Sequence, residues 1–253
     1  MSARTASELL FEAYLTEHGY EFAHEPDLGI VKRPDYLISR TDTEAVCEVK
    51  QFETTVMRDR LGGVGRGVGM LSSREVFGAV RNQLDAAARQ LKPLAGGQRP
   101  LVVVLGNPLA ADVRLSPENV VWAMYGNPTV GFAIDSTTGE LVSPPTSFAD
   151  QDGALTAKHA YISAVATLHE RDLDQDWADE TAKRFEKDPE GFLRYVNQAR
   201  HRGDVPVGTR RWVHVFHTLS ACEGDAVRLP DAFFDGPDDH AWHVVDGAYE
   251  RLR

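Results

Sequence analysis

A run of five consecutive apolar residues, from Leu101 to Leu105, constrains the fold of this chain more than any other feature. Side chains alternate across a β-strand, so a strand without polar positions must be covered on both faces. Parallel strands beneath helices provide that environment. The run therefore predicts a fully buried strand, with other elements packed on both of its faces.

Helical and extended segments alternate on the N-terminal side of this run. Thr5, followed three residues later by Glu8, forms a capping box that predicts the start of a helix. Two strands are predicted at 34–39 and 44–51, antiparallel and joined by a polar turn. A second capping box at Ser72 predicts a helix with one apolar stripe. The stripe consists of Val76, Val80, Leu84, Ala87 and Leu91.

The C-terminal half has weaker patterns. Strands are predicted at 120–125, 130–135, 160–168 and 212–216, and helices at 174–187 and from Pro189 onward. We expect a single domain over 1–253. Its core would comprise residues 1–110, and residues 111–253 would add strands and helices around the same sheet.

Bulk composition is that of a globular protein without disulfides or membrane spans. The 253 residues are 42% hydrophobic and include two cysteines. The N-terminus lacks a signal-peptide pattern, and no apolar run approaches the roughly 20 residues of a membrane span. These features predict a cytoplasmic protein with no membrane partner.

Charge is unevenly distributed along the chain. The net charge of −11 argues against nucleic-acid binding, because a negative field repels phosphates. However, residues 58–99 contain eight basic and three acidic side chains, a net of +5, which leaves −16 elsewhere. A positive surface is therefore predicted within this stretch. The candidate nucleic-acid contacts are Arg60, Arg66, Arg74 and Arg81.

The two predicted N-terminal strands carry the residues with the clearest chemistry. Asp35 begins the first strand, and Glu48 lies thirteen residues later on the second, with Lys50 two positions beyond it. Glu48 and Lys50 point to the same face because side chains alternate. Two carboxylates and a lysine at a strand pair can bind a hard divalent cation and act on a phosphodiester.

The order of these residues resembles that of the PD-(D/E)XK nuclease superfamily. The resemblance implies an α/β, restriction-endonuclease-like fold with a central mixed β-sheet flanked by helices. The match runs from helical Glu12 through Asp35, Glu48 and Lys50 to Gln83 on the next helix, over about the first 105 residues. The resemblance implies that Asp35, Glu48 and Glu12 bind Mg²⁺ or Mn²⁺. It also implies that Lys50 assists the attacking water and that Gln83 completes the catalytic set. Many such nucleases are homodimers.

The resemblance predicts a Mg²⁺-dependent nuclease of restriction, repair or phage defence, with DNA favoured as substrate. Some assignments have rivals. Glu8 competes with Glu12 for the helical acid, although capping already accounts for Glu8, and Gln90 competes with Gln83. Singly, Asp35 could be a strand-entry residue, and Glu48 with Lys50 an exposed ion pair.

Two functions of other classes stay open. One is a catalytically inactive fold that binds nucleic acid or a protein partner through its acidic surface, and the other is a hydrolase of a small phosphorylated substrate.

Gly63 to Gly69 matches neither a dinucleotide fingerprint nor a P-loop and predicts a flexible flap. A zinc site at His214-x-x-His217 and His240-x-x-His243 is disfavoured, because strand residues three apart face opposite sides.

Overall fold

The computed structural model describes residues 3–52, 73–109, 113–126, 128–129, 133–134, 137–142, 147–148, 153–155, 157–245 and 248–252. The chain divides into two compact units. The sheet unit comprises Met1–Leu168 and Val213–Arg253, and the hairpin unit comprises His169–Trp212. Among the described residues, no helix is long and apolar enough to cross a membrane.

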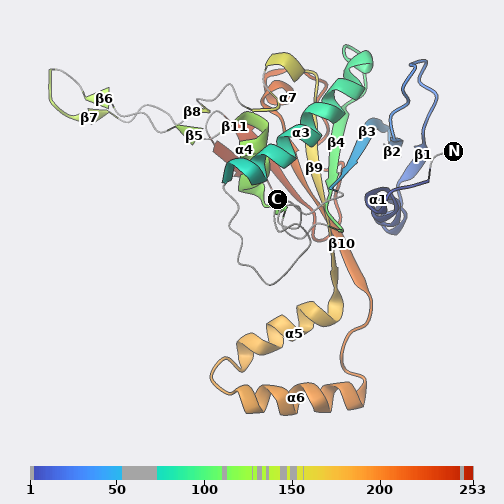
Figure 1. Cartoon of the computed structure of the whole chain (residues 1–253), viewed down its shortest axis with the longest axis vertical. Helices are drawn as coiled ribbons and strands as arrows, with labels where there is room; N and C mark the ends of the chain where they lie inside the picture. Colours follow the sequence, from blue (N-terminus) through green and yellow to red (C-terminus); the bar gives the residue numbers. More distant parts are fainter. Residues whose placement is uncertain are drawn as a thin grey trace, which may run out of the picture. The chain divides into compact units, whose positions relative to one another are not determined.

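One eight-stranded sheet organises the fold (Figure 1). The strands, in sheet order, are β1 (Glu21–His24), β2 (Tyr36–Arg40), β3 (Thr43–Gln51), β4 (Leu101–Gly106), β9 (Ala164–Asp172), β10 (Thr209–His217), β11 (His240–Val245) and β12 (Ala248–Arg251). Strand β2 pairs antiparallel with β1 and β3, whereas β4 pairs parallel with β3 and β9. Strand β11 pairs parallel with β10 and antiparallel with β12. The predicted α/β class with a mixed sheet is therefore confirmed.

Helices pack against both faces of the sheet. The sheet unit contains α1 (Ala6–Glu17), α3 (Ser73–Leu91), α4 (Pro117–Tyr125) and α7 (Leu219–Glu223), with short 3₁₀ helices at Lys92–Leu94 and Ala157–His159. Two short strand pairs lie outside the main sheet, β5 (Pro128–Thr129) with β8 (Ser147–Phe148) and β6 (Ala133–Ile134) with β7 (Leu141–Val142).

Strand β4 lies between two hydrophobic cores. Val103 and Leu105 pack with residues of α3 and α4, whereas Val102 and Val104 pack with residues of α1. All of β4 is buried, as the apolar run predicts. Burial of each such side chain stabilises the fold by roughly 1.5–3 kcal/mol.

The capping box of α1 is confirmed. The Thr5 hydroxyl accepts a hydrogen bond from Glu8 N at 3.2 Å, and the Glu8 carboxylate accepts one from Thr5 N at 2.6 Å. Helix α1 also approaches the end of β4 closely. A Cβ at Gly106 would lie 2.5 Å from Ser7 Oγ, so only glycine fits there without displacement.

The strand predicted at 120–125 is wrong, because these residues belong to α4. Pro117 occupies the first turn, where its fixed φ favours a helix, and Ser116 holds the N-cap position. The segment from Val120 to Tyr125 is almost entirely buried beside α3. A short apolar run shows no periodicity when every face is buried, so its pattern cannot distinguish a strand from a helix.

The sequence between α7 and β11 closes the face of the sheet that α1 covers. Phe233 and Phe234 join the α1 core. Buried Asp239 accepts hydrogen bonds from Tyr14 Oη at 2.5 Å, Val213 N at 2.8 Å and Gly236 N at 2.6 Å. A buried carboxylate needs such partners, so Asp239 connects α1, β10 and the C-terminal segment.

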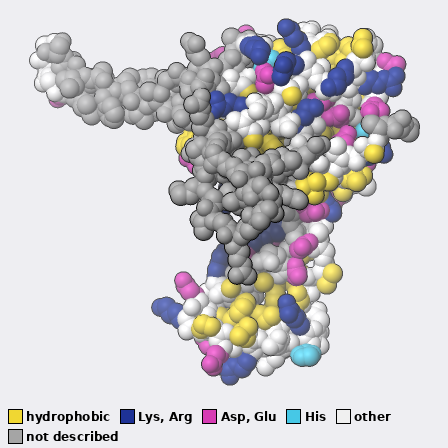
Figure 2. Space-filling view, in the orientation of Figure 1, with side chains coloured by type: hydrophobic (Ala, Val, Ile, Leu, Met, Phe, Trp, Pro, Cys, Tyr) yellow, Lys and Arg dark blue, Asp and Glu magenta, His cyan; other side chains and the backbone are white. Residues whose placement is uncertain are grey.

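The hairpin unit contains the helices α5 (Leu173–Arg184) and α6 (Pro189–Arg202), which the sequence predicts. Trp177 stacks on Tyr195 with ring centroids 6.1 Å apart. Hydrophobic side chains gather on its visible face (Figure 2), and Leu193 is 61% exposed. Packing between α5 and α6 thus leaves apolar surface uncovered.

Candidate metal-binding and catalytic site

The register of β2 and β3 places the two predicted carboxylates level with each other. Tyr36 pairs with Cys47, so the preceding residue, Asp35, comes level with Glu48. Level residues of antiparallel neighbours share a face. Glu48 pairs with Val103, which belongs to the core beneath α3. Asp35, Glu48 and Lys50 therefore gather on the α3 side, where β2 begins.

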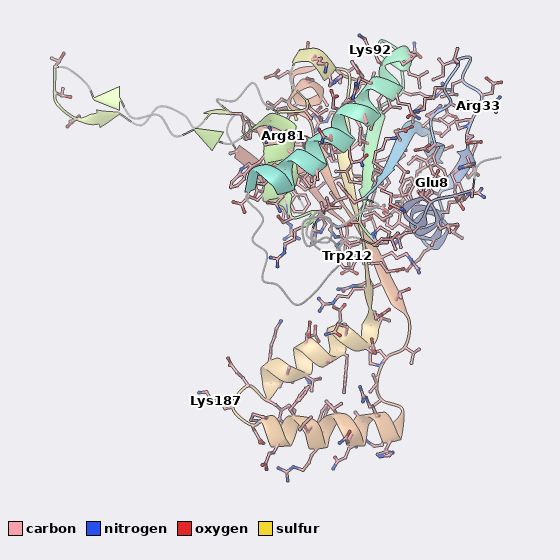
Figure 3. The ribbon with its side chains drawn as sticks, in the orientation of Figure 1. Glu8, Arg33, Arg81, Lys92, Lys187 and Trp212 are labelled. Carbon is pink, nitrogen blue, oxygen red and sulfur yellow. The ribbon has the colours of Figure 1, made fainter. Side chains whose placement is uncertain are left out.

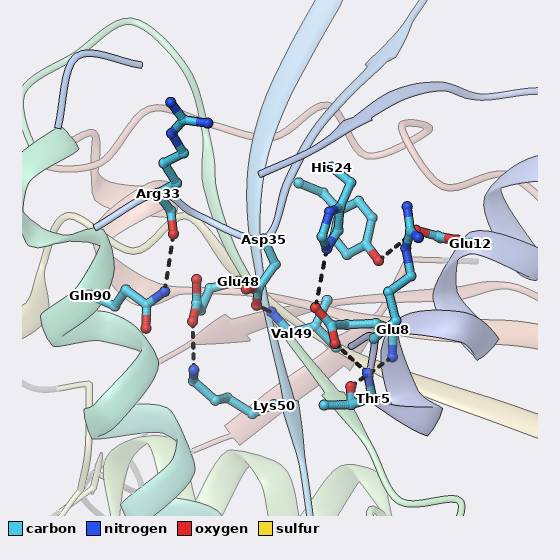
Figure 4. A network of polar contacts seen from close by, with 12 residues as sticks. Thr5, Glu8, Glu12, His24, Arg33, Asp35, Glu48, Val49, Lys50 and Gln90 are labelled. Atoms are coloured by element: carbon cyan, nitrogen blue, oxygen red, sulfur yellow. Dashed lines mark hydrogen bonds and ion pairs between the residues drawn. The ribbon is translucent and has the colours of Figure 1, made fainter. Parts of the chain in front are cut away.

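The Asp35 carboxylate is hydrogen-bonded to the backbone of β3. Its Oδ2 atom accepts a hydrogen bond from Val49 N at 2.7 Å (Figure 4). Val49 separates Glu48 from Lys50, so this bond places the Asp35 carboxylate directly at the predicted pair. Burial raises the pKa of Asp35, while the Val49 hydrogen bond and the charge of Lys50 oppose the rise.

Glu48 is a buried carboxylate with an incomplete set of partners. It is 1% exposed, and its Oε1 atom lies 2.5 Å from Lys50 Nζ. Burial and the charge of Asp35 raise the pKa of Glu48 and Lys50 lowers it, which gives a pKa of about 7. Within the described parts of the chain, Oε2 has no hydrogen-bond partner. A buried oxygen of this kind is costly unless a donor or cation satisfies it.

The donor set fits a hard divalent cation. Mg²⁺ prefers oxygen ligands and is commonly held by one or two carboxylates, while water and substrate phosphate complete its shell. Asp35 and Glu48 supply two carboxylates, and one Glu48 oxygen has no hydrogen-bond partner among the described residues. Their mutual repulsion, which contributes to the raised pKa of Glu48, would be relieved by a cation between them.

The structure places the two candidate helical acids differently. Glu12 Oε1 lies 2.5 Å from Arg4 Nε and accepts a hydrogen bond from Tyr36 Oη at 3.0 Å. Glu8, in contrast, raises the pKa of Asp35 through its charge. The Glu8 carboxylate accepts a hydrogen bond from Thr5 N at 2.6 Å and lies 3.6 Å from His24 Nε2, so both acids have partners outside the carboxylate cluster.

The two candidate glutamines lie on α3 near different parts of the site. Gln83 Nε2 donates to the backbone oxygen of Gln51 at 3.4 Å, next to Lys50 along β3. Gln90 Nε2 donates to the backbone oxygen of Arg33 at 3.4 Å, two residues before Asp35. Both amides thus support the backbone that carries the acidic and basic side chains.

The predicted arginine contacts are described only in part. Arg81 is half-buried on α3 (Figure 3). Arg74 belongs to the first turn of that helix, but its side chain lies outside the described residues, as do Arg60 and Arg66 entirely.

Sequence reasoning missed one basic residue. Lys32, in the loop between β1 and β2, carries a positive charge that lowers the pKa of Glu48. Its position three residues before Asp35 was the available signal.

A separate hollow of about 900 Å³ lies near the other end of β2 and β3. Its lining includes Ser39, Glu44, Arg99 and Arg228 but none of the three central residues of the candidate site. The chemistry of the carboxylate cluster, and not the size of a cavity, therefore identifies the candidate site.

Comparisons with protein-family models, curated proteins and solved structures found no match to this chain.

Proposed function

We propose that this chain is a metal-dependent nuclease that hydrolyses phosphodiester bonds, with DNA as the favoured substrate. The proposal is supported above all by one contact. The Asp35 carboxylate is hydrogen-bonded to the peptide nitrogen between Glu48 and Lys50, so three predicted catalytic residues lie at one point of the sheet. The Oε2 atom of Glu48, which has no partner in the part of the chain that the structure describes, adds a place for a cation.

Each residue has a distinct role in this proposal. Asp35 and Glu48 hold Mg²⁺ or Mn²⁺, and Glu48 must lose its proton to do so. Lys50, 2.5 Å from Glu48, orients the attacking water and offsets charge on the phosphate. A bound cation supplies a water of lowered pKa and neutralises the phosphate. Hydrolysis joins the water oxygen to phosphorus and breaks the bond to the leaving oxygen.

The order of elements also supports a restriction-endonuclease-like core. Helix α1, strands β1, β2 and β3, helix α3 and strand β4 occur in this order along the described residues, which is compatible with the order on which the resemblance rests. In this proposal β9 to β12 and the hairpin unit elaborate the core. Arg60, Arg66, Arg74 and Arg81 contact the phosphate backbone, because they follow the carboxylate strand directly in the sequence.

A non-catalytic binding module is the second candidate. It is favoured by the direct ion pair between Lys50 and Glu48, which already compensates part of the buried charge without a metal. The acidic surface formed by the remaining residues, whose net charge is −16 outside residues 58–99, would then contact a protein partner.

A cleavage panel distinguishes these candidates. Labelled single- and double-stranded DNA and RNA are incubated with the full chain and Mg²⁺, Mn²⁺, Ca²⁺ or a chelator. We expect cleavage with Mg²⁺ or Mn²⁺, none with the chelator, and the fastest reaction on DNA. Binding of nucleic acid without cleavage under every condition would favour the binding module.

A further inference from the structure

Two histidines lie side by side at a second location in the sheet unit. His217 on β10 pairs with His243 on β11, and because the strands are parallel their side chains share a face. Their ring centroids are 5.3 Å apart. His217 is 1% exposed, so one imidazole of the pair belongs to the interior.

A carboxylate completes this cluster. Asp231 lies between α7 and β11, and its Oδ1 atom is 3.4 Å from His243 Nε2 and 3.7 Å from His217 Nε2. The candidate ligand atoms of the three residues all lie within 4.8 Å of one another. Three separate segments of the chain thus bring two imidazoles and one carboxylate together.

We propose that His217, Asp231 and His243 form a zinc-class metal site, independent of the carboxylate site on β2 and β3. Zinc binds imidazole nitrogen and carboxylate oxygen at about 2.0–2.2 Å in a tetrahedron, which places neighbouring ligand atoms about 3.3 Å apart. The separations of 3.4 and 3.7 Å from Asp231 are close to that spacing. Two imidazoles select zinc over magnesium, which prefers oxygen ligands.

Arg228 occupies the mouth of this cluster. Its Nη2 atom lies 3.0 and 3.1 Å from the Asp231 oxygens and 3.1 Å from His243 Nε2. A guanidinium there neutralises Asp231, as a metal would. The Arg228 side chain is half exposed, so it can move into solvent when a metal binds. The fourth coordination position would then be open to water.

The spacing of the histidines along each strand does not predict this cluster. His214 and His217, three apart on β10, face opposite sides, and so do His240 and His243 on β11. The two histidine ligands come from neighbouring strands, at paired positions. The second cross-strand pair, His214 with His240, has ring centroids 5.2 Å apart, and Arg251 Nη2 contacts both ring nitrogens of His240.

Zinc binding to chelator-treated, full-length chain tests this assignment by titration calorimetry and metal analysis. The Glu48→Gln background removes competition from the other site. We expect one zinc per chain and a higher thermal unfolding midpoint, because the metal would connect β10, β11 and the segment before β11. Asp231→Asn and His243→Ala should each weaken zinc binding at least about tenfold.

Two further variants make the result decisive. His240 lies on β11, as His243 does, but pairs with His214, so His240→Ala should leave the zinc affinity unchanged. Arg228→Ala removes the cation that competes with zinc and should raise the zinc affinity. Absence of zinc binding, or equal affinity in the Asp231→Asn, His243→Ala and His240→Ala variants, would overturn the site and leave an Arg228–Asp231 salt bridge only. A lower zinc affinity in Arg228→Ala would contradict the proposal that zinc displaces the Arg228 guanidinium.

Discussion

Replacing Glu48 with glutamine is expected to slow metal-dependent cleavage of DNA by at least about 1,000-fold, which corresponds to about 4 kcal/mol of transition-state stabilisation. The reason is electrostatic. Glutamine is nearly isosteric but neutral, so it removes half of the carboxylate charge that would hold the cation. It also removes the anionic partner that fixes Lys50 at 2.5 Å. Single-turnover cleavage with Mn²⁺ measures the effect.

Glu44→Gln is the matched control for this substitution. Glu44 lies on the same strand and the same face as Glu48, but it pairs with Arg99 at 2.6 Å near the opposite end of β3. Its loss should change the cleavage rate less than threefold. Equal rates for the two variants would show that Glu48 has no role in catalysis, whatever its position.

The contribution of Glu48 to the stability of the metal-free protein should fall as pH rises. Its pKa is about 7 in the folded chain against 4.5 for an unperturbed glutamate. Below pH 4.5 both states hold the proton. Between 4.5 and 7 only the folded state does, so raising the pH favours unfolding. The difference in pKa corresponds to a loss on the order of 3 kcal/mol, complete above pH 7.

The free energy of unfolding, measured in chelator at pH 4.5 and pH 8, tests this linkage. Between pH 4.5 and pH 8, the free energy of unfolding of Glu48→Gln should rise by on the order of 3 kcal/mol relative to that of the wild type, because glutamine does not titrate. Glu44→Gln should follow the wild-type profile. Parallel profiles for the wild type and Glu48→Gln would mean that Glu48 ionises normally in the fold.

Strong local patterns predicted the N-terminal half of the fold. The capping box at Thr5, the antiparallel pair β2 and β3 and the buried strand β4 all follow from residue spacing and are confirmed. In contrast, α4 was predicted as a strand, since burial on every side removes the helical period. The order of strands β9 to β12 depends on long-range pairing, which no local pattern contains.

The candidate site could be predicted in part. Alternation along β3 put Glu48 and Lys50 on one face, and the register then brought Asp35 level with Glu48. The choice between Glu8 and Glu12 could not be made from spacing, because it depends on how α1 sits against β2. Tyr36 and Arg4 engage Glu12. Thr5 and His24 engage Glu8, whose charge also raises the pKa of Asp35. Similarly, the His217–His243 pair required the β10–β11 register.

Binding of Mn²⁺, followed by the electron paramagnetic resonance signal of the free ion, tests the central claim most directly. The His243→Ala background excludes the second cluster. At pH 8 this protein should bind Mn²⁺, with an apparent affinity that falls up to about tenfold per unit as pH drops below 7, since Glu48 must release its proton. Addition of Asp35→Asn or Glu48→Gln should abolish binding, whereas Glu44→Gln should not. Unchanged Mn²⁺ binding in the Asp35→Asn and Glu48→Gln proteins would contradict the assignment.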